Sequence, residues 1–403
     1  MPPRASKRTK LSDPAPPEKS AHNGADKHAI FTKWAHGRGV QVDGVGPAKL
    51  PGRGLGLVTS RAIAKGERVL FVPERAMFKP NARFLKIHSL DRASPHAQLA
   101  ISLTAVANSD GAPLAAWQAT WPTAEDFRQT LPLCWTKKHR NCLPASVQQP
   151  LERQEEDYRK DWHFVSDCCA DHDWSEQDFK YFWMIVNSRS FHFKPPRGRP
   201  GSMVMCPFID YMNHGPSGTT CNVFQSPQGY EVLADRDYEC GEEVLATYGA
   251  HSNDKLLVHY GFVCSSSPDS PNIDDDIRLD HILLPKLSDN IRSQLQDVGF
   301  LGAYALLPPT NELCFKTQVA VRAALLTCNE WEYFMSNGED LSSDYSAAVD
   351  GFMKPLLKGY HTEASENIRA LHSKRPGGCM EPAADLLMTR WTQIQEALEA
   401  YLK

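Results

Sequence analysis

The stretch Gly241-Glu242-Glu243-Val244-Leu245-Ala246-Thr247-Tyr248-Gly249 decides the fold of this chain. Glycine at both ends, with apolar residues between, predicts a short strand bounded by two turns. The strand leads into Tyr248, which taken alone is typical of an aromatic side chain packed on a strand. A functional meaning therefore has to come from the segments around it.

Four such segments surround this strand in the chain, and each has an ordinary structural explanation. The first is a glycine pair at a turn, and the others contain an asparagine suited to a turn, a histidine suited to a core and packed aromatics. The glycine pair is not a dinucleotide fingerprint, because no third glycine follows it and a strand rather than a helix comes next. The segments are Arg53-Gly54-Leu55-Gly56, Asn187-Ser188-Arg189-Ser190-Phe191, Pro207-Phe208-Ile209-Asp210-Tyr211-Met212-Asn213-His214 and Leu256-Leu257-Val258-His259-Tyr260-Gly261-Phe262.

The spacing of apolar residues along the chain predicts a β core that is split by a helical insertion. Residues 54–58 and 67–73 alternate apolar and β-branched positions, which predicts two short strands joined by a turn. From about 94 to 186 the apolar residues take helical spacing, and strand texture returns from 203 to 248.

Three parts follow from composition and pattern. Residues 1–28, rich in proline, serine and basic residues, predict a disordered basic tail. Residues 29–264 form the split β core, and the acidic, serine- and proline-rich stretch from 265 to 276 predicts a linker. Beyond it, residues 265–403 predict a helical C-terminal lobe.

Charge and hydropathy exclude several classes of protein. A net charge of −4 and a pI near 6.4 give no global basic field, so we expect a protein partner and no direct nucleic-acid binding. No apolar run is long enough to cross a bilayer, and none follows the early basic residues. We therefore expect no membrane contact and a location in the nucleus, the cytoplasm or both. The cluster Lys7-Arg8-Thr9-Lys10 fits either an import signal or a solvated tail.

The cysteines indicate neither a disulfide framework nor a metal site. There are eleven, an odd number, with no Cys-x-x-Cys pair. Cys168 and Cys169 are adjacent, a spacing that rarely serves one zinc ion. We expect reduced cysteines and no metal.

Taken together, the order Gly-x-Gly, Arg-Ser-Phe, Asp-x-x-Asn-His, Gly-Glu-Glu-Val-x-x-x-Tyr-Gly and Tyr-Gly-Phe resembles the motifs of the SET-domain methyltransferases. The similar branch is that of the Rubisco large-subunit methyltransferase, whose members modify ribosomal and other non-histone proteins. The resemblance covers roughly residues 50 to 263. It implies an α+β fold with small twisted sheets, a knot-like crossing, a helical insertion and an all-helical lobe that helps to hold the protein substrate.

The resemblance also implies the cofactor and the roles of individual residues. The cofactor is S-adenosylmethionine, and the catalytic residue is Tyr248. Cofactor-binding positions are Arg53, Gly54, Leu55, Arg189, Asn213, His214 and Tyr248. Positions lining a channel for the substrate lysine are Arg189, Phe191, Asp210, Tyr230, Ala246, Tyr248 and Tyr260.

The residue types suit transfer of a methyl group from a sulfonium to a neutral amine. A narrow aromatic channel disfavours the ammonium form of lysine, and the sulfonium repels it, so both lower the lysine pKa. A positioned phenol such as Tyr248 can orient the amine, whereas its own pKa near 10 leaves little phenolate to act as a base. Water is then the acceptor of the proton.

Two alternatives stay open. The chain could be a catalytically silent SET module that binds a lysine-bearing peptide, although Tyr248 and the Asn213-His214 pair are intact. It could also methylate histidine, as a relative that acts on actin does; that enzyme has replaced the tyrosine that is retained here as Tyr260. The cysteine-rich, zinc-binding segment of many histone-modifying members is missing. We therefore expect a monomeric lysine methyltransferase acting on a non-histone protein such as a ribosomal protein.

Overall fold

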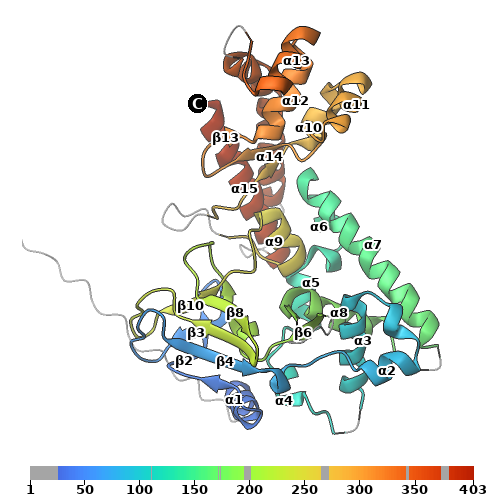
Figure 1. Ribbon diagram of the computed structural model, residues 1–403, viewed down its shortest axis with the longest axis vertical. Coiled ribbons are helices and arrows are strands. Elements are labelled where there is room, and N and C mark those ends of the chain that lie inside the picture. The colour runs from blue at the N-terminus through green and yellow to red at the C-terminus, as the bar shows by residue number, and fades with distance from the viewer. Residues whose placement is uncertain are drawn as a thin grey trace, which may run out of the picture.

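The computed structural model describes residues 26–109, 111–170, 172, 174–194, 201–264, 272–341, 345–373 and 381–403. Within them the chain has the predicted α+β fold, with a sheet-built core, a helical insertion beside it and a helical lobe at the far end (Figure 1). The basic cluster at residues 7–10 lies outside the described residues. Helix α1 (Lys27–Gly37) begins inside the last two residues of the expected tail.

Two four-stranded sheets form the core, in the orders β1-β4-β9-β8 and β2-β3-β10-β7. The strands predicted at 54–58 and 67–73 are present as β3 and β4, but they do not form a hairpin, because each pairs within a different sheet. A separate hairpin, β5-β6, follows the insertion. The strands are β1 (Gln41–Val42), β2 (Val45–Leu50), β3 (Gly54–Thr59), β4 (Arg68–Pro73), β5 (Ser190–Phe193), β6 (Ser202–Met205), β7 (Asn213–His214), β8 (Asn222–Ser226), β9 (Gly229–Leu233) and β10 (Glu243–Ala246).

The insertion is helical as predicted, and it starts earlier than position 94. Its last helix, α8, opens with a capping box between Ser175 and Asp178 and ends at Arg189, one residue before β5. This places the Arg-Ser-Phe motif at the junction of helix and strand. The helices are α2 (Ala82–Ile87), α3 (Pro95–Ala107), α4 (Ala115–Gln118), α5 (Ala124–Thr130), α6 (Lys137–Arg140), α7 (Ala145–Cys168) and α8 (Glu176–Arg189).

Helix α9 (Asn253–Tyr260) closes the core, and the lobe beyond it is helical with a small three-stranded sheet that the sequence pattern does not predict. The two longest helices of the lobe, α14 and α15, lie side by side (Figure 1). No helix of the described ranges is long and apolar enough to cross a membrane. The elements are β11 (Ile277–Arg278), α10 (Asp280–Leu283), α11 (Asp289–Asp297), β12 (Ala305–Leu307), β13 (Glu312–Leu313), α12 (Phe315–Leu325), α13 (Cys328–Asn337), α14 (Ser346–Ser373) and α15 (Pro382–Leu402).

Helix α1 packs directly against the Asp-x-x-Asn-His segment. Phe31 is fully buried, and its ring stacks on Phe208 at 5.2 Å between centroids and on Trp117 at 6.1 Å. Phe208 has a φ of 72°, which a non-glycine residue rarely adopts, so packing has to offset the strain. Helix α1 is therefore part of the support for this segment.

We expect Phe31→Ala to lower the free energy of unfolding by about 3–5 kcal/mol, because it removes a fully buried aromatic ring. The matched control is Ile30→Ala on the same helix, where the side chain is 47% exposed and the expected change is within about 0.5 kcal/mol. Urea unfolding followed by circular dichroism measures both. Equal losses for the two variants would contradict the supporting role of Phe31.

Candidate active site

Segments distant in the sequence meet where β10 lies between β3 and β7. Strand β10 pairs antiparallel with β3 and parallel with β7, with Leu245 opposite Asn213 and Ala246 opposite His214. One sheet therefore holds the strand that begins at Gly54, the Asn-His pair and the strand that leads to Tyr248. This is the juxtaposition that the predicted crossing requires.

An ionic network fastens these strands together. The Arg53 guanidinium donates to the carbonyl of His214 at 3.2 Å and forms an ion pair with Glu243 at 3.2 Å. The Asn213 amide donates to the Glu243 carboxylate at 2.9 Å. A Cβ at Gly56 would lie 2.7 Å from that carboxylate and 2.9 Å from the Asn213 amide nitrogen, so any other residue there would displace these groups. Sequence reasoning found Arg53 and Asn213 but missed Glu243, although it belongs to the deciding stretch.

Burial keeps the titratable groups next to this network uncharged. The Tyr248 backbone N–H donates to Nδ1 of His214 at 3.1 Å, so the neutral imidazole carries its hydrogen on Nε2. Burial lowers the pKa of His214 to about 4 and raises the pKa of the Tyr248 phenol to about 12. The Tyr248 hydroxyl donates to the carbonyl of Met212 at 2.7 Å. At neutral pH the site thus contains a neutral imidazole and a protonated phenol.

Tyr248 is part of an aromatic cluster with the Tyr-Gly-Phe segment. Its ring lies 4.9 Å from that of Tyr260 and 6.3 Å from that of Phe262. Phe262 also lies 6.2 Å from the His214 ring. Gly261, with a φ of 77°, ends α9 and turns the chain so that both aromatic rings reach Tyr248.

Arg189 and Asp210 add a charged pair beside the aromatic cluster. Arg189 donates to the Asp210 carbonyl at 2.6 Å, and its guanidinium lies 3.9 Å from the carboxylate. Trp117 donates to the same carboxylate at 2.9 Å. Burial raises the pKa of Asp210 to about 6, against the opposing effects of Arg189 and Trp117. Both charged residues influence the pKa of Tyr248, so this pair belongs to the same site.

A sequence model of the SET domain matches residues 54–249, the region that contains this site. The chain carries a SET domain. Its fold resembles solved Rubisco LSMT structures: one bound to AdoMet has a TM-score of 0.62 at 16% identity, covering 94% of this chain and 92% of that one. Another, bound to sinefungin and monomethyllysine, has a TM-score of 0.65 at 15% identity, covering 94% and 91%. The coverage extends the likeness in fold beyond the SET domain to the C-terminal lobe.

Relatives by sequence carry different names. Human SET domain-containing protein 4 is 24% identical over 258 residues, 59% of this chain and 58% of that protein. A ribosomal lysine N-methyltransferase of Schizosaccharomyces pombe is 27% identical over 47% of this chain and 50% of its own length. An actin-histidine N-methyltransferase of Callithrix jacchus is 23% identical over 57% and 41%. The chain thus matches between two fifths and three fifths of the length of these relatives.

Of the remaining predicted positions, Leu55 and Ala246 belong to the same sheet as the site, whereas Phe191 and Tyr230 lie in another part of the SET domain. Leu55 follows Gly54 in β3, opposite Lys49, and Ala246 accepts a hydrogen bond from the backbone of Gly215 at 3.1 Å. Phe191 and Tyr230 lie together, with ring centroids 5.8 Å apart, and the Tyr230 hydroxyl donates to the carbonyl of His192 at 2.5 Å. Tyr230 lies on β9, in the sheet that does not contain β10. The structure therefore pairs Tyr230 with Phe191, and its predicted place in the lysine channel stays a prediction.

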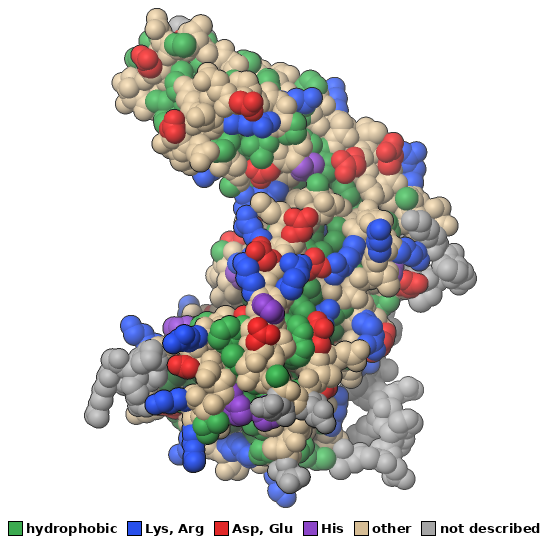
Figure 2. Space-filling view, turned by 90° about the vertical axis from the view of Figure 1, so that its right-hand side faces the viewer, with side chains coloured by type: hydrophobic (Ala, Val, Ile, Leu, Met, Phe, Trp, Pro, Cys, Tyr) green, Lys and Arg blue, Asp and Glu red, His purple; other side chains and the backbone are tan. Residues whose placement is uncertain are grey.

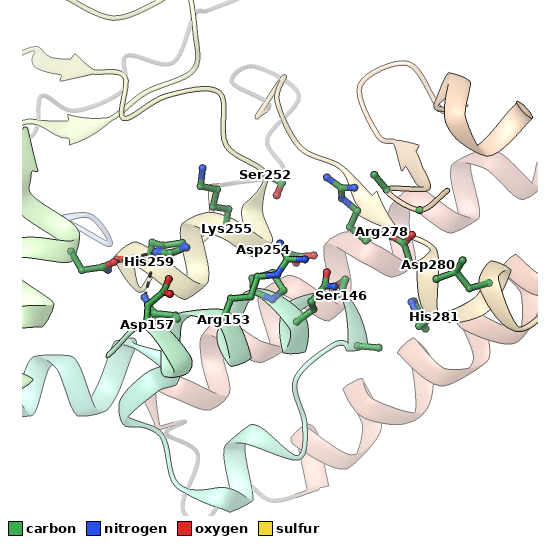
Figure 3. Close-up of a pocket in the computed structure, with 18 of the residues that line it drawn as sticks. Ser146, Arg153, Asp157, Ser252, Asp254, Lys255, His259, Arg278, Asp280 and His281 are labelled. Carbon is green, nitrogen blue, oxygen red and sulfur yellow. Dashed lines mark hydrogen bonds between the residues drawn. The ribbon is translucent and has the colours of Figure 1, made fainter. Parts of the chain in front are cut away.

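A cleft of about 1550 Å³ lies where α7 and α9 meet the start of the C-terminal lobe, and residues of α3 and α8 line it as well. Figure 2 shows a face of the molecule on which basic and acidic side chains mix across the middle. In Figure 3, side chains from these segments converge on the cleft, with His259 toward one end and His281 toward the other. Its charged residues include Arg153, Asp157, Lys160, Asp161, Asp254, Lys255, Arg278 and Asp280.

The cleft borders the candidate site through two neighbouring residues. Asn187 and His259 both line it, and the Asn187 amide donates to the His259 carbonyl at 2.6 Å. Asn187 lies two residues before Arg189, and His259 directly precedes Tyr260. Sequence reasoning missed the cleft, because no short motif records how several separate segments come together.

The described residues contain no group of three or more His, Cys, Asp or Glu that could hold a metal ion. The ten cysteines among them are free, and Cys168 and Cys169 lie at the end of α7. The absence of a metal from the reaction stays a prediction.

The raised pKa of Asp210 predicts a specific pH dependence of stability. Because the folded state binds this proton more tightly than the unfolded state, whose carboxyl has the ordinary pKa of 3.8, the contribution of Asp210 falls as pH rises from 3.8 through about 6. The free energy of unfolding of Asp210→Asn, taken relative to that of the wild type, should therefore rise by on the order of 3 kcal/mol between pH 4 and pH 7. Urea unfolding at several pH values measures this gain. Asp289→Asn, at a fully exposed position, should show no such trend. If the pH profile of Asp210→Asn ran parallel to that of the wild type, the raised pKa of the buried Asp210 carboxyl would be refuted.

Proposed function

We propose that this protein is an S-adenosylmethionine-dependent protein-lysine N-methyltransferase acting on a non-histone protein such as a ribosomal protein. One observation carries the proposal: the protonated phenol of Tyr248 lies where β7 and β10 join, and its ring centroid is 4.9 Å from that of Tyr260. A lysine beside these rings would lose hydration, which favours its neutral form. The lysine N-methyltransferase named among the relatives supports the same acceptor.

The residues at the crossing fit S-adenosylmethionine. Gly54 has a φ of 73° and open space where a Cβ would be, which leaves the backbone of residues 53–55 accessible to a ligand. The Nε of Arg189 is a buried donor without a partner among the described residues, so a ligand acceptor could satisfy it. Together with Asn213 and His214 these groups would hold the cofactor. When bound, it supplies an electrophilic methyl group on a sulfonium.

The protein's own task is to align and desolvate the acceptor. The lysine nitrogen forms a bond to the methyl carbon while the carbon–sulfur bond breaks, giving S-adenosylhomocysteine and a methylammonium that loses its proton to water. Tyr248 can orient the amine by its hydroxyl and ring, since alignment of the reacting groups lowers the barrier. With a pKa of about 12 its phenol stays protonated, and this supports water rather than Tyr248 as the proton acceptor.

Tyr260 favours lysine over histidine as the acceptor. An actin-histidine N-methyltransferase is also among the relatives, so the histidine alternative needs its own test. Tyr260 narrows the aromatic cluster around Tyr248, which suits a thin alkylamine better than a planar imidazole. The intact network of Arg53, Asn213 and Glu243 argues against a silent module.

We further propose that the protein substrate docks along the charged cleft and the C-terminal lobe. The cleft adjoins Tyr260 through His259 and offers side chains of both charges to a protein surface. We propose a monomer in the nucleus, the cytoplasm or both, without direct contacts to nucleic acid or a membrane.

Cofactor binding should depend on Asn213. We expect S-adenosylmethionine to raise the melting temperature of the wild type, because a ligand that binds only the folded state stabilises it. Asn213→Ala should abolish most of this rise and weaken the affinity at least about tenfold, equivalent to about 1.4 kcal/mol. Calorimetric titration measures the affinity, and Asn290→Ala at an exposed position of α11 is the control. Normal affinity in Asn213→Ala would place the cofactor elsewhere.

Methyl transfer should depend on the Tyr248 hydroxyl. With radiolabelled S-adenosylmethionine and a hypomethylated cell extract, the wild type should label a protein band, and mass spectrometry should find methyllysine in it. Tyr248→Phe should reduce the rate about 10²-fold or more at nearly unchanged cofactor affinity. The control is Tyr401→Phe, whose hydroxyl bonds Asp350 in the C-terminal lobe.

Each other outcome of this assay has a distinct meaning. If the labelled band contained methylhistidine, the acceptor would be histidine and not lysine. Cofactor binding without any labelled band would favour the silent module. An unchanged rate in Tyr248→Phe would remove the role of the phenol while leaving the activity in place.

A further inference from the structure

A fully buried arginine joins the C-terminal helix to the SET domain. Arg390 of α15 has 0% exposure, and its Nε donates to Asp254 of α9 at 2.6 Å. Its Nη1 donates to Asp275 at 2.8 Å, and its Nη2 donates to the carbonyl of Asp276 at 3.2 Å. A buried cation with two carboxylate partners fixes the geometry of all three groups, because separating them would leave charges uncompensated.

This arginine completes the N-terminal cap of α9. The residue that precedes the helix, Ser252, makes no capping hydrogen bond through its side chain. Instead, one oxygen of Asp275 accepts from the backbone N–H of Asn253 at 2.8 Å, while the other accepts from Arg390. A helix needs partners for its first N–H groups, and α9 obtains one of them from a residue that α15 holds in place.

A second residue of α15 fastens the chain after α9. Gln393 donates through Nε2 to the carbonyl of Cys264 at 2.6 Å and accepts through Oε1 from the Asn253 amide at 3.0 Å. The side-chain oxygen of Asn253, Oδ1, in turn accepts from the backbone N–H of Cys264 at 3.0 Å. Helix α15 therefore holds both ends of the segment from Asn253 to Cys264.

That segment carries the aromatic half of the candidate site. Tyr260, Gly261 and Phe262 lie between the two fixed ends, and both aromatic rings contact Tyr248. A shift of α9 along its axis would change the spacing of these rings directly. Misplacing a reacting group by about 1 Å can cost an enzyme about 10²-fold in rate.

We infer that Arg390 and Gln393 are positioning residues of the candidate active site, and that they hold Tyr260 and Phe262 against Tyr248 through α9 and Cys264. The inference rests on the proposed methyltransferase activity and extends it: helix α15 forms part of the catalytic scaffold in addition to any part in docking. Among the described residues, neither makes a hydrogen bond or ion pair with Arg53, Asn213 or Glu243. Their effect should therefore appear in turnover rather than in cofactor affinity.

The first test compares two glutamines on the same helix. Gln393→Leu removes the bonds to Asn253 and Cys264, whereas Gln395→Leu removes a bond to Ser365 of α14, inside the lobe. Hydrogen exchange of the full-length protein, read by mass spectrometry on peptides covering residues 253–264, should be at least about tenfold faster in Gln393→Leu and unchanged in Gln395→Leu. This measurement needs no substrate.

The second test uses turnover. With the labelled extract, Gln393→Leu should lower kcat about tenfold or more and leave the affinity for S-adenosylmethionine within about twofold, while Gln395→Leu should change neither. Arg390→Lys keeps the charge but not the forked geometry, so an intermediate loss of kcat is expected. Arg322→Lys, which makes the same exchange in a buried pair with Asp340 inside the lobe, is the matched control and should keep kcat.

The outcomes separate this inference from the proposed function. Unchanged exchange over residues 253–264 in Gln393→Leu, or equal effects in Gln395→Leu, would overturn the positioning role. Wild-type kcat in Gln393→Leu would overturn it as well. If the wild type transfers no methyl group at all, the proposed function fails, whereas the exchange experiment still decides whether α15 holds the Tyr-Gly-Phe segment.

Discussion

The site depends on strand β10 lying between β3 and β7. The parallel pairing with β7 involves only two residues on each strand, which is too little backbone contact to be stable alone. The Glu243 carboxylate strengthens it, because it accepts from Asn213 and pairs with Arg53. Gly56 leaves room for these groups where any side chain would collide. The segments proposed for cofactor and acceptor are thus joined by one carboxylate.

Burial sets the charge state around this junction. It keeps His214 neutral and Tyr248 protonated, and it raises the pKa of Asp210 to about 6. Arg189, beside Asp210, is then the cation that most affects the Tyr248 phenol. A site with little net charge would neither repel a sulfonium strongly nor stabilise a lysine ammonium. This balance suits the proposed reaction better than a strongly acidic pocket, which would hold the amine in its protonated form.

The sequence predicts those parts of the site that lie within short motifs. Asn213, His214 and Tyr248 could be found because neighbouring residues in each motif mark them, and the order of the motifs specifies the fold. Pairing between segments distant in the chain cannot be predicted from a short motif. The sequences of β3 and β4 are typical of two strands joined by a turn, yet the strands belong to different sheets. Arg390 binds carboxylates 136 and 115 residues away, and nothing near it in the sequence indicates a buried ion pair.

The predicted boundary near residue 265, which rests on linker composition, therefore does not separate two parts whose stabilities are independent. Removing the C-terminal lobe would leave the buried carboxylate of Asp254 without its arginine and α9 without the Asp275 cap. Breaking a buried ion pair on one side costs more than the pair gains, because the remaining charge loses its compensation. The helix that would become unstable is the one that ends at Tyr260. The SET domain and the lobe thus share one helix, so the geometry of the candidate site depends on both.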